Sequence, residues 1–300
     1  MLDTVAIGLG EDAYDPDRCR STLEQILQSA LSEFGLRARV SERQKSMQTV
    51  LDCQFDGAGR RDADQGGPTR ALCRRLLARA LSHLIMEQEE RLVRRVIRNQ
   101  YDEFDSDEQA VILNQAVQFL RDQKEPELGN RQDRVSTRLF EFLSHNDQIH
   151  LDGFVTFRLK DYIGELQDAV DRAVDDYLID QEYRDFIYLL KYFVEVQEPR
   201  VDMVHVIIDS NGWFTLINDE GETLDQETLQ ELVNEIGKDQ IVFGDLLVSA
   251  LISIAPRQVL LHRPGSRIAS ETMDTIRRVF DGRVYTCRGC STCRAGYRRG

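Results

Sequence analysis

Between residues 69 and 198 the apolar residues keep a helical spacing almost without interruption. They recur every three or four positions, which is typical of helices that bury one face. The first members of the series are Leu72, Leu76, Leu77, Ala80, Leu81, Leu84 and Ile85. Pro199 closes the stretch, because proline cannot continue a helix. We therefore expect a central helical bundle over residues 69–199. Its longest pattern, residues 155–194, is expected to form two helices that separate near Ile179.

Short strand-like patterns flank this helical region on both sides. Residues 1–55 predict a small β-α-β-β unit, with its helix over residues 18–34 and Gly35 in the left-handed conformation that follows many helices. Residues 56–68 contain four glycines and a proline among charged residues, which is typical of a linker. Residues 200–286 predict a mixed-sheet α/β domain.

The C-terminal domain is expected to contain a hairpin, a buried helix over residues 245–255 and a final β-α-β unit. The strands of that last unit are predicted at residues 259–262 and 284–286, and a β-α-β connection makes its two strands parallel with a right-handed crossover. Residues 287–300 form a tail rich in cysteine, arginine and glycine. The predicted fold class is thus α/β (α+β), with three structured parts.

Composition narrows the classes of function. The chain carries 52 acidic and 38 basic residues, for a net charge of −14, so we do not expect a general nucleic-acid coat or a polybasic membrane binder. We find no run of 18 apolar residues, and the first residues lack the basic segment of a secretory signal. Six cysteines in 300 residues are too few for a disulfide scaffold. We therefore expect a cytoplasmic protein without a membrane span.

Three of the six cysteines lie within seven residues, at Cys287, Cys290 and Cys293. Two residues between successive thiolates allow one loop to wrap around a metal ion, with backbone N–H groups turned toward the sulfurs. Arg288 and Arg294 would lower the thiol pKa values and offset the negative charge of the site. Zinc takes four ligands and an iron–sulfur cluster usually takes four, so the loop requires one more. A redox disulfide and an inert tail remain the alternatives.

The parallel strands suggest the fourth ligand. Sites in open sheets gather at the carboxyl ends of parallel strands. His262 ends one predicted strand and Cys287 follows the other, so both leave the sheet at the same edge. We therefore predict a metal site, with zinc first and an iron–sulfur cluster as the alternative, at Cys287, Cys290, Cys293 and His262. A histidine that simply ends a strand remains the other interpretation of His262.

A second unusual segment is strongly basic. Eight arginines and three glutamates fall between residues 70 and 98. The arginines are Arg70, Arg74, Arg75, Arg79, Arg91, Arg94, Arg95 and Arg98. Clustered arginines can bind phosphates, which would make this segment a nucleic-acid-binding module. We favour pairing within the protein, with the acidic helices of residues 161–198.

Three sequence pieces resemble a known family. They are FRLKDY at residues 157–162, LKYFV at residues 190–194 and the run from Ser249 to His262. Over about residues 135–286 the chain resembles the YtxC-like family, which is associated with sporulation in spore-forming Firmicutes. The resemblance implies a cytoplasmic protein linked to endospore formation. It implies neither a reaction nor catalytic residues.

The favoured function is a non-enzymatic structural or interaction protein with an unidentified protein partner and a metal-binding C-terminus. Catalytic residues are not predicted. The alternative is an enzyme that acts on a phosphorylated or nucleic-acid substrate at the C-terminal strand edge, near His262 and Arg263. These readings differ in what they require of the fold: a pocket at the strand edge for an enzyme, an exposed arginine face for a nucleic-acid-binding module, or an exposed apolar surface for an interaction protein.

Overall fold

The structure is a computed structural model, and its contacts divide the chain into two compact units, Met1–Tyr177 and Leu178–Gly300. It describes residues 3–10, 14–45, 48–57, 68–122, 130–208, 214–224, 243–262 and 270–290. Both units combine helices with a mixed sheet, so the predicted α/β (α+β) class is confirmed. Each unit is described by itself below.

The first unit is built on a four-stranded sheet in the order β2-β3-β1-β4. The strands are β1 (Asp3–Leu9), β2 (Leu36–Lys45), β3 (Gln48–Gly57) and β4 (Gln148–His150). Strand β3 pairs antiparallel with both β1 and β2, whereas β4 pairs with β1 in parallel. Alternate residues of β1 are buried, so one face of this strand carries the core. The sequence analysis did not anticipate β4, whose three residues are too few to show a period.

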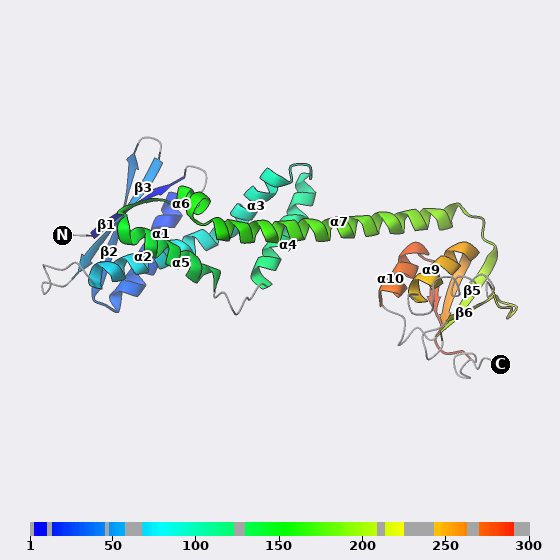
Figure 1. The fold of residues 1–300 in the computed structure, drawn as a ribbon. Coiled ribbons are helices and arrows are strands. Elements are labelled where there is room, and N and C mark those ends of the chain that lie inside the picture. The colour runs from blue at the N-terminus through cyan, green and yellow to red at the C-terminus, as the bar shows by residue number, and fades with distance from the viewer. Residues whose placement is uncertain are drawn as a thin grey trace. The chain divides into compact units, whose positions relative to one another are not determined.

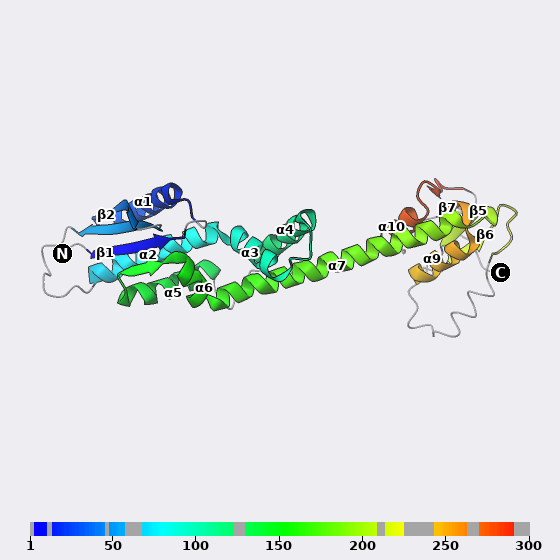
Figure 2. The same ribbon diagram turned by 90° about the horizontal axis from the view of Figure 1, so that it is seen from above.

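Helices of the first unit pack beside this sheet (Figures 1 and 2). Helix α1 contacts β2 and α2, and α2 in turn contacts α5. Before α7 (Lys160–Val196), the helices are α1 (Pro16–Ser32), α2 (Pro68–Glu87), α3 (Glu89–Gln100), α4 (Ser106–Asp122), α5 (Arg131–His145) and α6 (Leu151–Arg158). Asp15 caps α1, and Gly35 beyond its end has a φ of +66°, as predicted from the sequence.

One hydrophobic core joins the sheet and these helices. It contains buried residues from β1 through α7 up to Tyr177, for example Ile7, Leu27, Leu81 and Leu139. The sequence analysis expected a linker at residues 56–68 between separate parts. Most of that segment lies outside the described residues, and the elements on its two sides share this core.

Helix α7 (Lys160–Val196) is a single helix of 37 residues. The predicted separation near Ile179 is therefore wrong. The residues around Ile179 include neither proline nor glycine, so nothing in the local sequence ends the helix. The helix begins after a break at Leu159, and its length is about 56 Å at 1.5 Å per residue. Its first part belongs to the first unit, and its residues from Leu178 onward belong to the second.

The second unit contains a four-stranded sheet in the order β6-β5-β7-β8. The strands are β5 (Val201–Ile208), β6 (Phe214–Ile217), β7 (Pro256–His262) and β8 (Val284–Thr286). Strands β5 and β6 form the predicted antiparallel hairpin. Strands β7 and β8 are parallel neighbours, also as predicted, and β5 pairs with β7 in parallel.

Helices α9 (Phe243–Ile254) and α10 (Ser270–Val279) pack beside this sheet (Figure 1). Together with β5, β7 and residues of α7 such as Ile187 and Val194, they form a second hydrophobic core. Residues 225–242, between β6 and α9, lie outside the described residues.

The most buried charge of the first unit is Arg74 on α2, whose side chain is 2% exposed. Its guanidinium donates to Asp3 on β1, to Asp147 before β4 and to the backbone carbonyl of Leu143 at the end of α5. The neighbouring Arg70 pairs with the same two aspartates but is half exposed. The hydrogen bond from Arg74 lowers the pKa of Asp147. Arg74 thus fastens two helices to the two parallel strands.

We predict that Arg74→Leu lowers the free energy of unfolding by about 3 kcal/mol, because it leaves Asp3 and Asp147 facing an apolar side chain. Arg70→Leu is the matched control and should cost at most about 1 kcal/mol, since Arg70 is solvated. Urea unfolding at neutral pH measures both. The folded-state pKa of Asp147 is depressed, so its contribution is present above its ordinary pKa of 3.8 and is lost as the pH falls through the lower folded-state value. Equal losses in the two variants would contradict this role.

Candidate metal site

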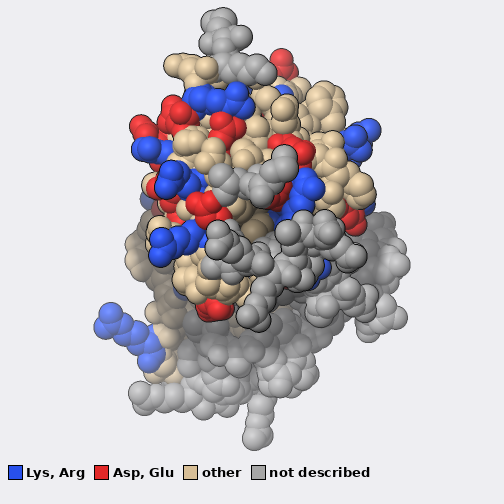
Figure 3. Space-filling view, turned by 90° about the vertical axis from the view of Figure 1, so that its left-hand side faces the viewer, with Lys and Arg blue, Asp and Glu red and all other residues tan. Residues whose placement is uncertain are grey.

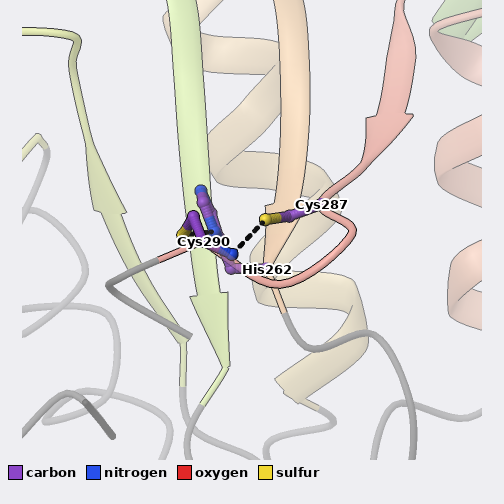
Figure 4. Close-up of side chains that lie close together, drawn as sticks. All are labelled: His262, Cys287 and Cys290. Carbon is purple, nitrogen blue, oxygen red and sulfur yellow. Dashed lines mark hydrogen bonds between the residues drawn. The ribbon is translucent and has the colours of Figure 1, made fainter. Parts of the chain in front are cut away.

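The pairing of β7 with β8 brings His262 and Cys287 to one edge of the second sheet. Leu261 is the register partner of Thr286, so the chain continues into His262 on one strand and Cys287 after the other. The backbone N–H of Cys287 donates to the carbonyl of Leu261 at 2.8 Å, which extends the ladder by one residue. His262 is buried, at 4% exposure, whereas Cys287 is half-buried. Figure 4 shows both side chains close together at this edge.

The turn after β8 then brings Cys290 back toward His262. The backbone N–H groups of Gly289 and Cys290 both donate to Sγ of Cys287, each at 3.4 Å. Gly289 has a φ of +111°, a conformation that strains any residue with a side chain. Sγ of Cys290 lies 3.4 Å from Nδ1 of His262. The loop therefore turns two backbone N–H groups toward one sulfur, that of Cys287.

Three ligand atoms converge at this site. One ring nitrogen of His262 and the sulfurs of Cys287 and Cys290 all lie within 4.8 Å of one another. Tetrahedral zinc with bonds of about 2.0–2.3 Å would hold its ligand atoms about 3.3–3.8 Å apart. The largest spacing thus exceeds that of a zinc site by about 1 Å, a movement that one loop turn can supply. Cys293, the fourth predicted ligand, lies outside the described residues, as does Arg263.

Two further side chains extend the cluster that sequence reasoning did not identify. Nδ1 of His205 on β5 lies 2.9 Å from Nε2 of His262, and Nε2 of His205 lies 3.0 Å from Oδ1 of Asp219 in the turn after β6. The two imidazole planes are inclined by only 18°. The sequence shows His205 as an isolated histidine in an apolar strand. Only the register between β5 and β7 brings it to His262.

The three described cysteines of the first unit have a different environment. Cys19, Cys53 and Cys73 are all buried in the core. Burial raises the pKa of the Cys19 thiol to about 11 and that of the Cys53 thiol to about 12, and it also raises the pKa of Cys73. These thiols are protonated at neutral pH and serve as small apolar side chains.

The eight arginines of the basic segment have different environments; Arg75 lies over the ring of Phe140, and Arg79 is exposed. Arg70 and Arg74 pair with Asp3 and Asp147, and none of the ion pairs between described residues joins the segment to the acidic residues of α7, so that expected pairing is not what the structure has. The arginines of α3, at spacings of three and four residues, are exposed on one face: Arg91, Arg94, Arg95 and Arg98. On the face of the molecule shown in Figure 3, basic and acidic side chains alternate and form no uniform basic field.

A cavity of about 620 Å³ lies in the first unit, between α5 and the start of α7. Two of the arginines that line it form ion pairs within the cavity wall: Arg134 contacts Glu165, and Arg138 contacts Asp161 and Glu141. The residues that line it are distant in sequence from the β7–β8 edge, where the alternative enzyme site is expected. The aspartates of α7 from Asp168 to Asp176 are exposed and do not form a metal-ligand cluster among the described residues.

Within the second unit, α7 carries a series of exposed apolar side chains. These side chains are between 38% and 74% exposed, and they include three tyrosines. They are Leu178, Ile179, Tyr183, Phe186, Tyr188, Leu189, Tyr192, Phe193 and Val196. Tyr162 and Tyr177, in contrast, are buried in the first unit.

Comparison with known proteins places the chain in a family. The sequence profile of the YtxC-like family matches residues 75–285, which include the β7–β8 edge but end before Cys287. The chain belongs to the YtxC-like family. It is 31% identical over 188 residues to the Bacillus subtilis (strain 168) protein described as uncharacterized protein YtxC; this match covers 60% of this chain and 64% of that protein.

No solved structure matches the chain. Within the described parts, we find no helix that combines the length and the apolar character needed to cross a membrane.

We predict that iodoacetamide at pH 8 modifies Cys287 and Cys290 of the metal-free folded protein well before Cys19, Cys53 and Cys73. The reason is that the latter three are buried and have raised pKa values, so few of their thiols are ionised. Peptide mass spectrometry over a time course measures the order. Modification in urea, where all thiols are accessible, provides the control. Labelling of Cys53 as fast as that of Cys290 would contradict the assignment of Cys53 as a buried thiol.

Proposed function

We propose that this protein is a cytoplasmic, non-enzymatic zinc-binding protein with a structural or interaction role in sporulation. The observation that carries the zinc proposal is the convergence of His262, Cys287 and Cys290 within 4.8 Å at the β7–β8 edge. The link to sporulation rests on the family resemblance alone.

The donor set favours zinc over the other candidates. Three sulfurs and one imidazole, with Cys293 as the fourth ligand, form one of the common structural zinc sets. Iron–sulfur clusters usually take four cysteines, and magnesium or calcium prefers oxygen ligands. A disulfide between Cys287 and Cys290 would use neither His262 nor the two N–H donors that point at one sulfur.

A site with four protein ligands has no open position for water or substrate, which is typical of structural rather than catalytic zinc. Zinc bound here would tie the segment after β8 to the end of β7. Strand β8 has only three residues, so a bond beyond its end would stabilise the edge of the sheet.

Purified full-length protein should contain about one zinc ion per chain, measured by elemental analysis and by titration with a chromophoric chelator. Cys290→Ser and His262→Ala should each lower the zinc content, because three ligands hold the ion less tightly than four. Zinc removal should lower the thermal stability of the second unit, and readdition of zinc should restore it.

Cys73→Ala is the matched control, since Cys73 is a buried thiol of the first unit, and it should keep the zinc content unchanged. Unsubstituted protein that binds no zinc at micromolar concentrations would overturn the proposal. Stoichiometric iron together with visible absorbance would instead indicate an iron–sulfur cluster at this site.

The exposed apolar side chains of α7 favour a second candidate function, self-association of two copies through this helix. Ile179, Phe186 and Phe193 follow one another at intervals of seven residues, and Leu189 and Val196 lie three residues beyond the last two. This is the a/d spacing of two helices that pack side by side as a coiled coil. The opposite side of the helix already packs into the core of the second unit through Ile187 and Val194. A helix that is apolar on both sides is normally buried on both. A second copy of α7 has the matching spacing.

Self-association predicts a dimer at micromolar concentrations in analytical ultracentrifugation. The double substitution Phe186→Glu and Phe193→Glu should make the protein monomeric, because it puts like charges at two successive positions of the seam. Phe34→Glu replaces an equally exposed phenylalanine of the first unit and should leave the dimer intact. This interface is excluded if the unsubstituted protein stays monomeric up to about 100 times these micromolar concentrations. It is also excluded if the dimer survives the double substitution.

A further inference from the structure

The chain of side chains behind His262 gives the site a defined proton arrangement. An ionised carboxylate only accepts hydrogen bonds, so the contact between Asp219 Oδ1 and His205 Nε2 requires the proton on Nε2 of His205. In the neutral form of this ring, Nδ1 of His205 then has a lone pair. The 2.9 Å contact to Nε2 of His262 therefore requires the proton of His262 to lie on Nε2.

This assignment leaves Nδ1 of His262 as an unprotonated nitrogen that faces the sulfur of Cys290. Nδ1 is the atom that a metal at this site would use. Metal-binding histidines are commonly held in one tautomer and one ring orientation by a partner on the other nitrogen. The three contacts of 3.4, 2.9 and 3.0 Å form such a connection from Cys290 to Asp219.

We propose that His205 and Asp219 are positioning residues that fix His262 as an Nδ1 metal ligand; this inference rests on the proposed zinc-binding function. His205 is held in a strand of the core sheet and is only 21% exposed, so its ring has little freedom. Asp219 is 58% exposed, but its turn is organised by Asn218, whose side chain accepts from the N–H groups of Glu220 and Glu222. The contacts from Asp219 through His205 and His262 to Cys290 thus connect the strands β6, β5 and β7 to the cysteine loop.

The mechanism also predicts which substitutions preserve function. Glutamine at position 205 has a carbonyl oxygen that can accept from His262 and an amide N–H that can donate to Asp219. Asparagine at position 219 keeps an acceptor oxygen but loses the charge. Alanine at either position removes the connection. A residue with a merely structural role would show no such distinction between conservative and truncating substitutions.

Zinc affinity and the cobalt(II) absorption spectrum of the full-length protein test this proposal. His205→Ala should weaken zinc binding by about 10- to 100-fold and shift the cobalt d–d bands, and Asp219→Ala should weaken it less. His205→Gln should recover most of the affinity and of the spectrum. His145→Ala, an exposed histidine of α5, should change neither. Circular dichroism of the metal-free variants verifies that each is folded.

Histidine tautomers provide a second readout that does not need metal. Long-range ¹H–¹⁵N correlation spectra of the metal-free protein should show His262 protonated at Nε2, and His205→Ala should allow both tautomers. If the unsubstituted protein binds zinc, and folded His205→Ala has the same zinc affinity and the same cobalt spectrum, this inference alone is overturned. A protein that binds no zinc or cobalt would overturn the proposed function together with it. His262 protonated at Nδ1 in the unsubstituted protein would overturn the tautomer assignment whatever the metal result.

Discussion

The parallel pairing of β7 with β8 is the constraint on which the candidate site depends. It fixes the carboxyl end of one strand beside the carboxyl end of the other, so the residues that follow Leu261 and Thr286 must be neighbours. Antiparallel strands would send His262 and Cys287 to opposite edges of the sheet. The ladder also continues through the N–H of Cys287, which sets where the cysteine loop begins. The geometry of the three ligands therefore follows from strand direction and not from the loop alone.

This dependence explains what the sequence could predict at the site. The β-α-β pattern of residues 259–286 implies parallel strands, and strand direction brings His262 and Cys287 together without coordinates. His205 and Asp219 could not be found in this way. His205 reaches His262 only because Ile207, two residues further along the same strand, is the register partner of His262. No local pattern encodes an offset of 55 residues between two strands, and the position of Asp219 depends on a turn beyond a third strand.

A similar distinction holds for the fold. The strands and helices with a clear period were predictable, whereas the continuity of α7 was not. Its apolar series changes phase between Tyr177 and Ile187, which resembles the boundary between two helices. The cause is that the buried residues before this point pack into one hydrophobic core and those after it into another. Sequence periodicity reports which residues are buried. It does not report whether the same core buries them.

Arg74 and His262 have comparable positions in their units, and the comparison bears on the role of the C-terminal site. Each is the most buried polar side chain near the end of parallel strands, and each connects segments far apart in the sequence. Arg74 does so with the fixed charges of Asp3 and Asp147, which are present whenever the chain folds at neutral pH. His262 faces the thiols of Cys287 and Cys290, and the proposed zinc ion would bond to all three side chains. If zinc supplies that bond, the first unit is complete in itself, while the edge of the second sheet depends on metal supply. A structural site in this position would therefore make the second unit responsive to zinc without any change in the first.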